Sequence, residues 1–149
     1  MIGVGNRDRG DDAAGPVVCD LLRSVGTCGV ETVVLEGSVV DLPLHWGPHD
    51  HVVIVDASAP AGEPGRITDV DALVDRLVAP GTLSTHSVDV GAAVELARAL
   101  GRLPATLTIV GIEGGSFGFG DDLGPEVRRS VDCVVSRISR RAARRAAGP

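Results

Sequence analysis

The sequence predicts an α/β sandwich built on a parallel sheet. Short apolar runs rich in β-branched residues alternate with segments of helical periodicity, and this alternation is typical of such folds. The chain has 149 residues, of which 44% are hydrophobic, so it can bury one core but is too short for two ordinary domains. We therefore expect one domain that spans residues 1–149.

The expected strands are short and apolar enough to be buried in the sheet. They span residues 2–4, 30–35, 51–55 and 107–112, and the first is very short for a central strand. Helical patterns cover residues 13–24, 39–44, 69–77, 88–100 and 125–147. Ser38 is expected to cap the second helix, and Pro125 suits the first turn of the last one. The Pro- and Gly-rich residues 59–65 predict a surface loop before an edge segment at 66–68.

Composition excludes several classes of function. The net charge is −6, and the chain contains two Phe, one Trp and no Tyr, which argues against a nucleic-acid-binding surface. No apolar run approaches the roughly 20 residues of a membrane span, and the first residues lack the pattern of a signal peptide. We expect a cytoplasmic protein that binds neither nucleic acid nor membranes.

Cysteines and arginines support no site of their own. The odd set of Cys19, Cys28 and Cys133 contains no Cys-x-x-Cys pair, which disfavours disulfides and a thiolate zinc site. Cys19 and Cys133 fall in apolar helical patterns and are expected in the core. The C-terminal half of the last helix carries five arginines that could bind an anionic partner, but cations are favourable near a helix C-terminus, so we interpret them as a solvated tail. They are Arg137, Arg140, Arg141, Arg144 and Arg145.

A glycine turn after the first strand delivers two carboxylates, Asp11 and Asp12, to an expected helix start. A nucleotide loop keeps its helix N-terminus free of acid, so that bare N–H groups can hold phosphate. The pair therefore indicates a cation site, although one carboxylate could simply cap the helix. A Rossmann-like nucleotide module remains the rival, with Glu36 as its ribose-binding acid. Its Gly-x-Gly-x-x-Gly fingerprint fails at the third glycine, where the residue is Asp8.

Polar residues that follow the strands are expected to meet at one edge of the sheet, where ligands bind in open parallel sheets. Asp12, Asp56 and His86 are the candidates. Asp56 directly follows Val-Val-Ile-Val, and a buried charge is costly unless it is paired or binds a metal. Two carboxylates and an imidazole suit nickel, zinc or another divalent first-row ion. His86 could instead cap a helix or bond a backbone carbonyl.

A second group of histidines lies close together in the sequence. His45, His49 and His51 surround Trp46, and such a cluster could also bind a metal. Their spacing follows no common ligand pattern, and one of them is expected to open a strand, so we disfavour this site.

Several motifs together resemble the hydrogenase maturation endopeptidases, which trim the C-terminus of the nickel-containing large subunit of nickel-iron hydrogenases. Residues 3–15 resemble the family's opening Gly-x-Gly-Asn with its acidic pair and glycine, and residues 52–57 resemble its strand ending in Asp-Ala. Residues 84–86 occupy the place of its loop histidine, and residues 107–112 and 123–127 resemble its last strand and the start of its final helix. The order and spacing of these motifs cover nearly the whole chain.

The resemblance implies a three-layer sandwich with a twisted, mostly parallel five-stranded sheet and helices on both faces. It also implies that Asp12, Asp56 and His86 are the nickel ligands and catalytic residues. The nickel would arrive inside the hydrogenase large-subunit precursor as a recognition signal, and zinc or cadmium could occupy the site in vitro. The expected enzyme is a monomer. The segment 36–41 lacks the second glycine and the threonine common in the family, which weakens a substrate-facing role for Glu36 or Asp41.

The chemistry of cleavage stays open at this point. A metal-polarised carbonyl, a metal-activated water and a carboxylate general base are all compatible with the three residues. No Ser-His-Asp or Cys-His motif stands out, so nucleophilic catalysis is disfavoured. A catalytically idle homologue that only binds a metal site is a further alternative.

Overall fold

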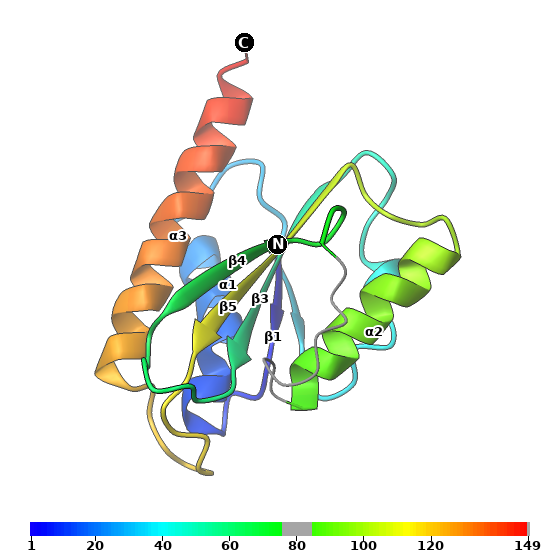
Figure 1. Cartoon of the computed structure of the whole chain (residues 1–149). Helices are drawn as coiled ribbons and strands as arrows, with labels where there is room; N and C mark the ends of the chain where they lie inside the picture. The colour runs from blue at the N-terminus through cyan, green and yellow to red at the C-terminus, as the bar shows by residue number, and fades with distance from the viewer. Residues whose placement is uncertain (76–84, 149) are drawn as a thin grey trace.

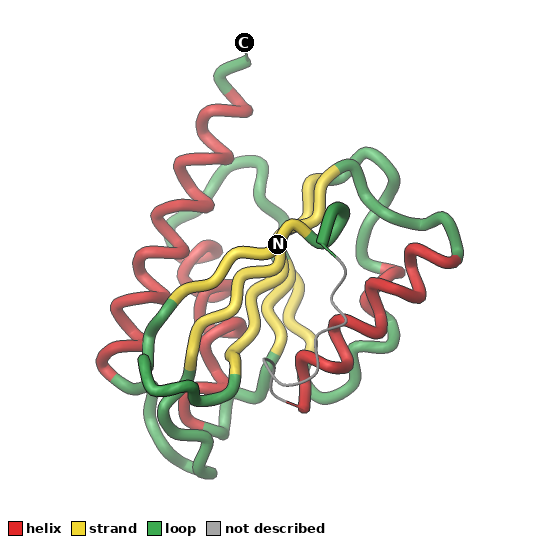
Figure 2. The backbone as a smooth tube through the Cα atoms, in the orientation of Figure 1, coloured by secondary structure: helices red, strands yellow, loops and turns green. Residues whose placement is uncertain are grey.

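The chain folds around a five-stranded, mostly parallel sheet. The computed structural model describes residues 1–75 and 85–148, without the side chains of residues 85–89. The strands are β1 (Ile2–Val4), β2 (Val33–Leu35), β3 (His51–Ser58), β4 (Ile67–Asp71) and β5 (Thr106–Glu113), in the order β2-β1-β3-β5-β4. Only β4 runs antiparallel to its neighbour among these strands. Figure 2 shows the strands fanning out with a twist between the helices.

Helices cover both faces of the sheet, as Figure 1 shows. On one face α1 (Ala14–Ser24) packs beside the long α3 (Pro125–Ala146). On the other face lie α2 (Thr85–Ala99) and the short 3-10 helix η2 (Leu42–Leu44). The fold is therefore the predicted three-layer sandwich, and the first and last helices agree with their expected bounds to within one or two residues.

The sheet separates two hydrophobic cores. In β3, Val52 and Ile54 face α2, whereas Val55 and Ala57 face α1 and α3. Burial on both faces explains why the strand reads as a nearly continuous apolar run. Because successive side chains alternate between the faces, Asp56 belongs to the α2 face of the sheet.

Helix α1 lies unusually close to the sheet. A Cβ atom at Gly15 would lie 2.4 Å from the carbonyl oxygen of Val4 and 2.5 Å from that of Val55. A Cβ atom at Gly3 would in turn lie 2.3 Å from the carbonyl oxygen of Gly15. Two glycines therefore let the helix backbone contact β1 and β3 directly, and this contact places the residues before α1 at the carboxyl ends of both strands.

Two expected helices are wrong. Of the segment 69–77, residues 69–71 belong to β4, which runs from Ile67 to Asp71 and pairs with β5 through backbone hydrogen bonds. In the segment 39–44 only η2 is helical, because Pro43 lacks the N–H group that a longer helix would need. The Ser38 hydroxyl accepts a hydrogen bond from the Val40 N–H at 3.3 Å but caps no helix.

The other differences are shifts in bounds. Strand β2 is shorter than residues 30–35, whereas β3 and β5 extend beyond their expected ends and α2 begins three residues earlier than predicted. None of the helices that the structure describes is both long and apolar enough to cross a membrane.

The cysteines are free thiols in different environments. Cys19 is buried as predicted, and its Sγ atom lies 3.3 Å from the carbonyl oxygen of Val33, to which it donates a hydrogen bond. The prediction that Cys133 lies in the core is wrong, because this residue is exposed. Helix α3 turns Val131 and Val134 toward the core, so Cys133 points toward the solvent.

We expect Gly15→Ala to lower the free energy of unfolding by about 3 kcal/mol or more, because the added methyl group meets rigid backbone atoms of two strands. Urea unfolding followed by circular dichroism measures the change. Gly26→Ala is the control, since its Cβ would meet open space and only the positive φ of 60° is strained, at about 1 kcal/mol. Equal losses in both variants would contradict the close approach of α1.

Candidate active site

Two predicted site residues meet at the carboxyl end of the sheet. Asp12 lies in a 3-10 helix, η1 (Gly10–Ala13), which follows β1, and Asp56 lies near the end of β3. Their exposed fractions are only 2% and 3%. Asp12 is close enough to Asp56 for its charge to affect the ionisation of that residue. The structure thus brings together the two carboxylates that the sequence predicted to converge.

The glycine turn after β1 packs against the backbone of Asp12. Gly5 has a φ of 137°, and a Cβ atom there would lie 1.9 Å from the carbonyl oxygen of Asp12. One carboxylate oxygen of Asp12 accepts a hydrogen bond from the Asn6 N–H at 3.1 Å. The Gly-x-Gly pattern therefore folds the turn tightly against the acidic residue.

Asp56 carries a buried carboxyl group that is only weakly compensated. Neither of its carboxylate oxygens has a hydrogen-bond partner among the residues that the structure describes. Burial, and then the nearby charge of Asp12, raises the pKa of Asp56 from 3.8 to about 7, although the Ala57 N–H opposes the shift. Such a group either keeps a proton or binds a cation, because an isolated buried carboxylate is strongly unfavourable.

The third predicted residue, His86, lies in the first turn of α2, and its side chain is outside the described residues. In Figure 1 the lower end of α2, where this helix begins, lies at the same end of the molecule as the carboxyl ends of β1 and β3. Among the described side chains, no group of three or more His, Cys, Asp or Glu residues could hold a metal ion. The role of His86 therefore stays a prediction.

Asp11 has a different function from its neighbour. Its carboxylate accepts hydrogen bonds from the N–H groups of Gly115, Ser116 and Gly124, at 2.8, 3.0 and 2.7 Å. Neither η1 nor α1 has a side-chain cap, so the interpretation of the acidic pair as a helix cap is wrong. Asp11 instead anchors the loop of residues 114–124 beside the site. No local pattern in the sequence indicates this role, because the three donors lie more than 100 residues away in the chain.

Glu113 is a further buried acid that sequence reasoning missed. It ends β5, and its Oε1 atom accepts hydrogen bonds from the N–H groups of Ala61 and Glu63, at 2.6 and 2.7 Å. These two donors hold the pKa of Glu113 below its ordinary value. The residue fixes the loop of residues 59–65 to the end of the sheet.

The residues that could have formed a nucleotide site make other interactions. Glu36 lies 3.0 Å from the Nε atom of Arg7, which also pairs with Asp20, so the expected ribose-binding acid belongs to an exposed ion-pair network. The buried Asp12 stands where a pyrophosphate would need bare N–H groups.

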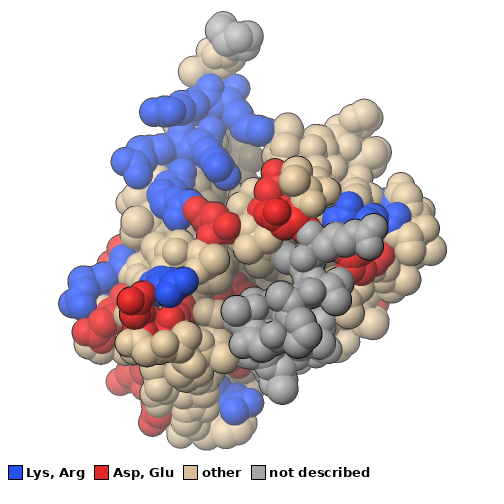
Figure 3. All heavy atoms as spheres, viewed as in Figure 1, with Lys and Arg blue, Asp and Glu red and all other residues tan. Residues whose placement is uncertain are grey.

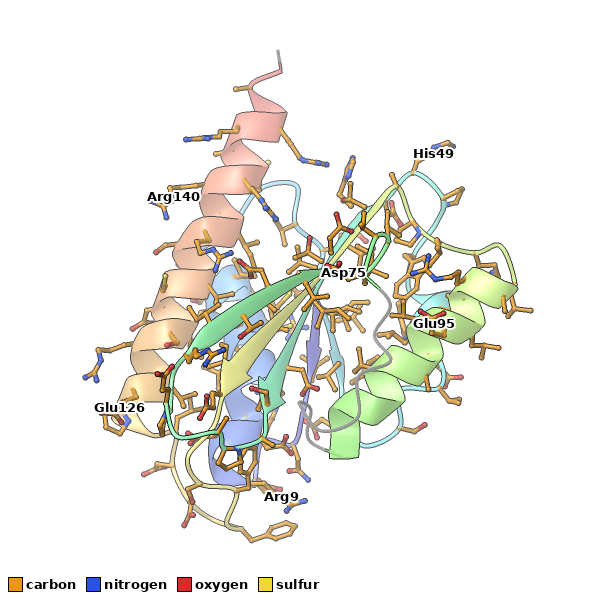
Figure 4. All side chains as sticks on the ribbon, in the orientation of Figure 1. Arg9, His49, Asp75, Glu95, Glu126 and Arg140 are labelled. Atoms are coloured by element: carbon orange, nitrogen blue, oxygen red, sulfur yellow. The ribbon has the colours of Figure 1, made fainter. Side chains whose placement is uncertain are left out.

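The second histidine group lies at the other end of the sheet. The Nδ1 atom of His51, the first residue of β3, lies 3.0 Å from the Thr106 hydroxyl at the start of β5. Trp46 donates a hydrogen bond from its indole N–H to the carbonyl oxygen of Arg102 at 2.7 Å. His49 points away from the body of the molecule in Figure 4, so this group shows no convergence on a metal.

Figure 3 shows that the arginines of α3 form a basic surface over the last turns of the helix. Arg137 pairs with Asp69 of β4. Arg140, Arg141, Arg144 and Arg145 are exposed.

Comparisons with known proteins agree on one family. Residues 28–141 match the HycI family model, which is described as hydrogenase maturation protease. The structure is similar to the nickel-iron hydrogenase maturation protease HybD from Thermococcus kodakarensis, with 25% identity, a TM-score of 0.73 and coverage of 95% of this chain and 96% of that chain. No curated protein matches the chain significantly.

Two further solved structures have similar folds. The hydrogenase maturating endopeptidase HybD from E. coli is 23% identical, with a TM-score of 0.76, and the match covers 99% of this chain and 91% of that chain. Hydrogenase 2 maturation peptidase from a Thaumarchaeota archaeon is 28% identical, with a TM-score of 0.65 and coverage of 92% of both chains. The family match includes the positions of Asp56 and His86, and the structural matches extend over nearly the whole chain.

We expect Asp11→Asn to reduce the free energy of unfolding by about 2 kcal/mol or more, because the amide replaces an acceptor oxygen among three backbone donors. Chemical denaturation measures this loss. Asp132→Asn, on the exposed surface of α3, removes the same charge and should leave stability nearly unchanged. Equal stabilities of the two variants would refute the anchoring role of Asp11.

Stability of the metal-free protein should depend on the ionisation of Asp56. Between its unfolded pKa of 3.8 and its folded pKa of about 7, the unfolded chain releases a proton that the folded chain retains, so rising pH favours unfolding. Over this pH range we expect the free energy of unfolding of wild type to fall by up to roughly 4 kcal/mol relative to that of Asp56→Asn. Above this range the difference should not grow further.

Urea unfolding at pH 4 to 8 with a chelator present tests this dependence. If the free energies of unfolding of wild type and Asp56→Asn changed with pH in parallel, Asp56 would ionise in the folded protein as it does in the unfolded chain. This outcome would contradict the prediction.

Proposed function

Because the chain belongs to the hydrogenase maturation protease family and is an endopeptidase, we propose that it removes the C-terminal peptide of a nickel-loaded hydrogenase large-subunit precursor. The precursor is the partner, and the nickel within it is the recognition signal. The cytoplasmic location and monomeric state expected from the sequence stay predictions.

The observation that carries this proposal is the buried carboxyl group of Asp56, whose oxygens lack a hydrogen-bond partner among the described residues. A divalent cation would replace the proton on Asp56 and offset its repulsion with Asp12. Carboxylate oxygens beside an imidazole form a ligand set that suits nickel. In this proposal His86 supplies the imidazole.

Three protein ligands leave coordination positions open. Nickel that arrives with the precursor would keep some ligands of the precursor and bind Asp12, Asp56 and His86 through the remaining positions. The metal then bridges enzyme and substrate, and a nickel-free precursor lacks this bridge. Zinc or cadmium would occupy the same ligands in vitro.

The same residues support peptide hydrolysis. The metal supplies Lewis acidity toward the scissile carbonyl group. A pKa of about 7 lets the carboxyl group of Asp56 take up or release a proton near neutral pH when it is not bound to the metal. Asp12 is buried in the turn after β1, and Asp56 is buried in β3. The attacking group and the metal would therefore meet in a site of fixed geometry.

We expect the protein to shorten a nickel-loaded precursor from the same organism and to leave the nickel-free precursor intact. Mass spectrometry of the intact precursor before and after incubation measures the loss of a C-terminal peptide. Asp56→Ala and His86→Ala should abolish the loss, because each removes a ligand of the bridging metal.

Glu36→Ala is the matched control, since it removes an exposed carboxylate and should preserve processing. Full activity of both ligand variants would overturn the site assignment. Failure of wild type to cleave a verified, loaded cognate precursor would favour an idle homologue that only binds the metal site.

A further inference from the structure

An exposed aromatic side chain stands at the same edge of the sheet as the two aspartates. Phe119 belongs to the loop of residues 114–124, which follows the carboxyl end of β5, and its exposed fraction is 76%. The guanidinium carbon of Arg9, in the loop after β1, lies 5.4 Å from the centre of the Phe119 ring. We call Arg9 and Phe119 together the Phe119 rim. Single exposed apolar side chains are common on protein surfaces. Phe119 differs from the others in its position at the edge of the sheet that carries the two aspartates and in its cation–π contact with Arg9.

The rim is held rigidly although it is exposed. Asp11 anchors the loop through three backbone N–H groups, and the Gly120 N–H donates to the carbonyl oxygen of Asp8 at 2.8 Å. Phe117, two residues before the exposed ring, packs against the core beneath α1 and α3. A preorganised aromatic side chain loses little conformational entropy when a partner covers it.

Arg9 forms no ion pair with the described residues. Its Nε atom has no hydrogen-bond partner among them. Figure 4 shows its side chain at the lower tip of the molecule, beyond the carboxyl ends of the strands. The rim is joined to the site through the backbone, because the Asp12 N–H donates to the carbonyl oxygen of Arg9 at 3.1 Å.

We propose that the Phe119 rim docks the precursor segment beside the scissile bond. An apolar side chain of this segment covers the Phe119 ring, and a backbone carbonyl oxygen of the segment accepts a hydrogen bond from the Arg9 guanidinium. The occupant is a peptide and not a nucleic acid, because Asp8, Asp121 and Asp122 lie on the same two loops and repel a phosphate backbone. This assignment rests on the proposed function and adds a specificity-determining surface to it.

Steady-state kinetics of precursor cleavage test the rim. Phe119→Ala should raise KM about five- to tenfold and change kcat less than about twofold, because the ring binds substrate and transition state alike. Arg9→Gln should raise KM about threefold for the same reason. Val25→Ala removes another exposed apolar side chain, 62% exposed, at the C-terminal end of α1 and should leave both constants unchanged.

The outcomes separate the two proposals. If wild type cleaves the loaded precursor and Phe119→Ala has an unchanged KM, the rim does not dock the substrate and the proposed function stands. A reduced kcat in Phe119→Ala with an unchanged KM also overturns docking. If wild type cleaves no loaded precursor, the proposed function fails and the docking inference fails with it. Equal unfolding midpoints of the variants ensure that any change in KM reports binding.

Discussion

Direct contact between α1 and the sheet is the constraint on which the site depends. The absence of side chains at Gly3 and Gly15 lets the backbone of α1 lie against β1 and β3. Because this helix begins immediately after η1, its approach brings the turn of residues 10–12 to the end of β3. A helix at ordinary packing distance, separated by side chains, would hold Asp12 farther from Asp56.

Two adjacent aspartates at this turn have opposite energetic roles. Asp11 is buried, but its carboxylate accepts hydrogen bonds from three backbone N–H groups, so it stabilises the fold. Asp12 has one backbone donor, and its charge acts on Asp56, whose carboxylate oxygens have no hydrogen-bond partner among the described residues. The fold thus uses one carboxylate to build the turn and holds the other two carboxyl groups close together in the protein interior.

Buried carboxylates also hold the loops around the site in place. Asp11 joins the turn after β1 to the loop after β5, and Glu113 joins the end of β5 to the loop before β4. Each connection pairs a buried carboxylate with backbone donors from a distant segment, which is favourable where loops cannot satisfy their own N–H groups. The loops at the carboxyl end of the sheet therefore form one supported structure around the aspartates.

The sequence by itself determined the layered fold, the strands β1, β3 and β5, and the convergence of Asp12 and Asp56. These features follow from local apolar patterns and from the rule that parallel strands end at one edge. Only the tertiary structure decided that the edge segment expected at 66–68 continues as a strand to Asp71, that Cys133 is exposed, and that Asp11 is an anchor. An edge strand depends on its neighbour for hydrogen bonds, and the donors of Asp11 lie more than 100 residues away in the chain, so no local pattern encodes them.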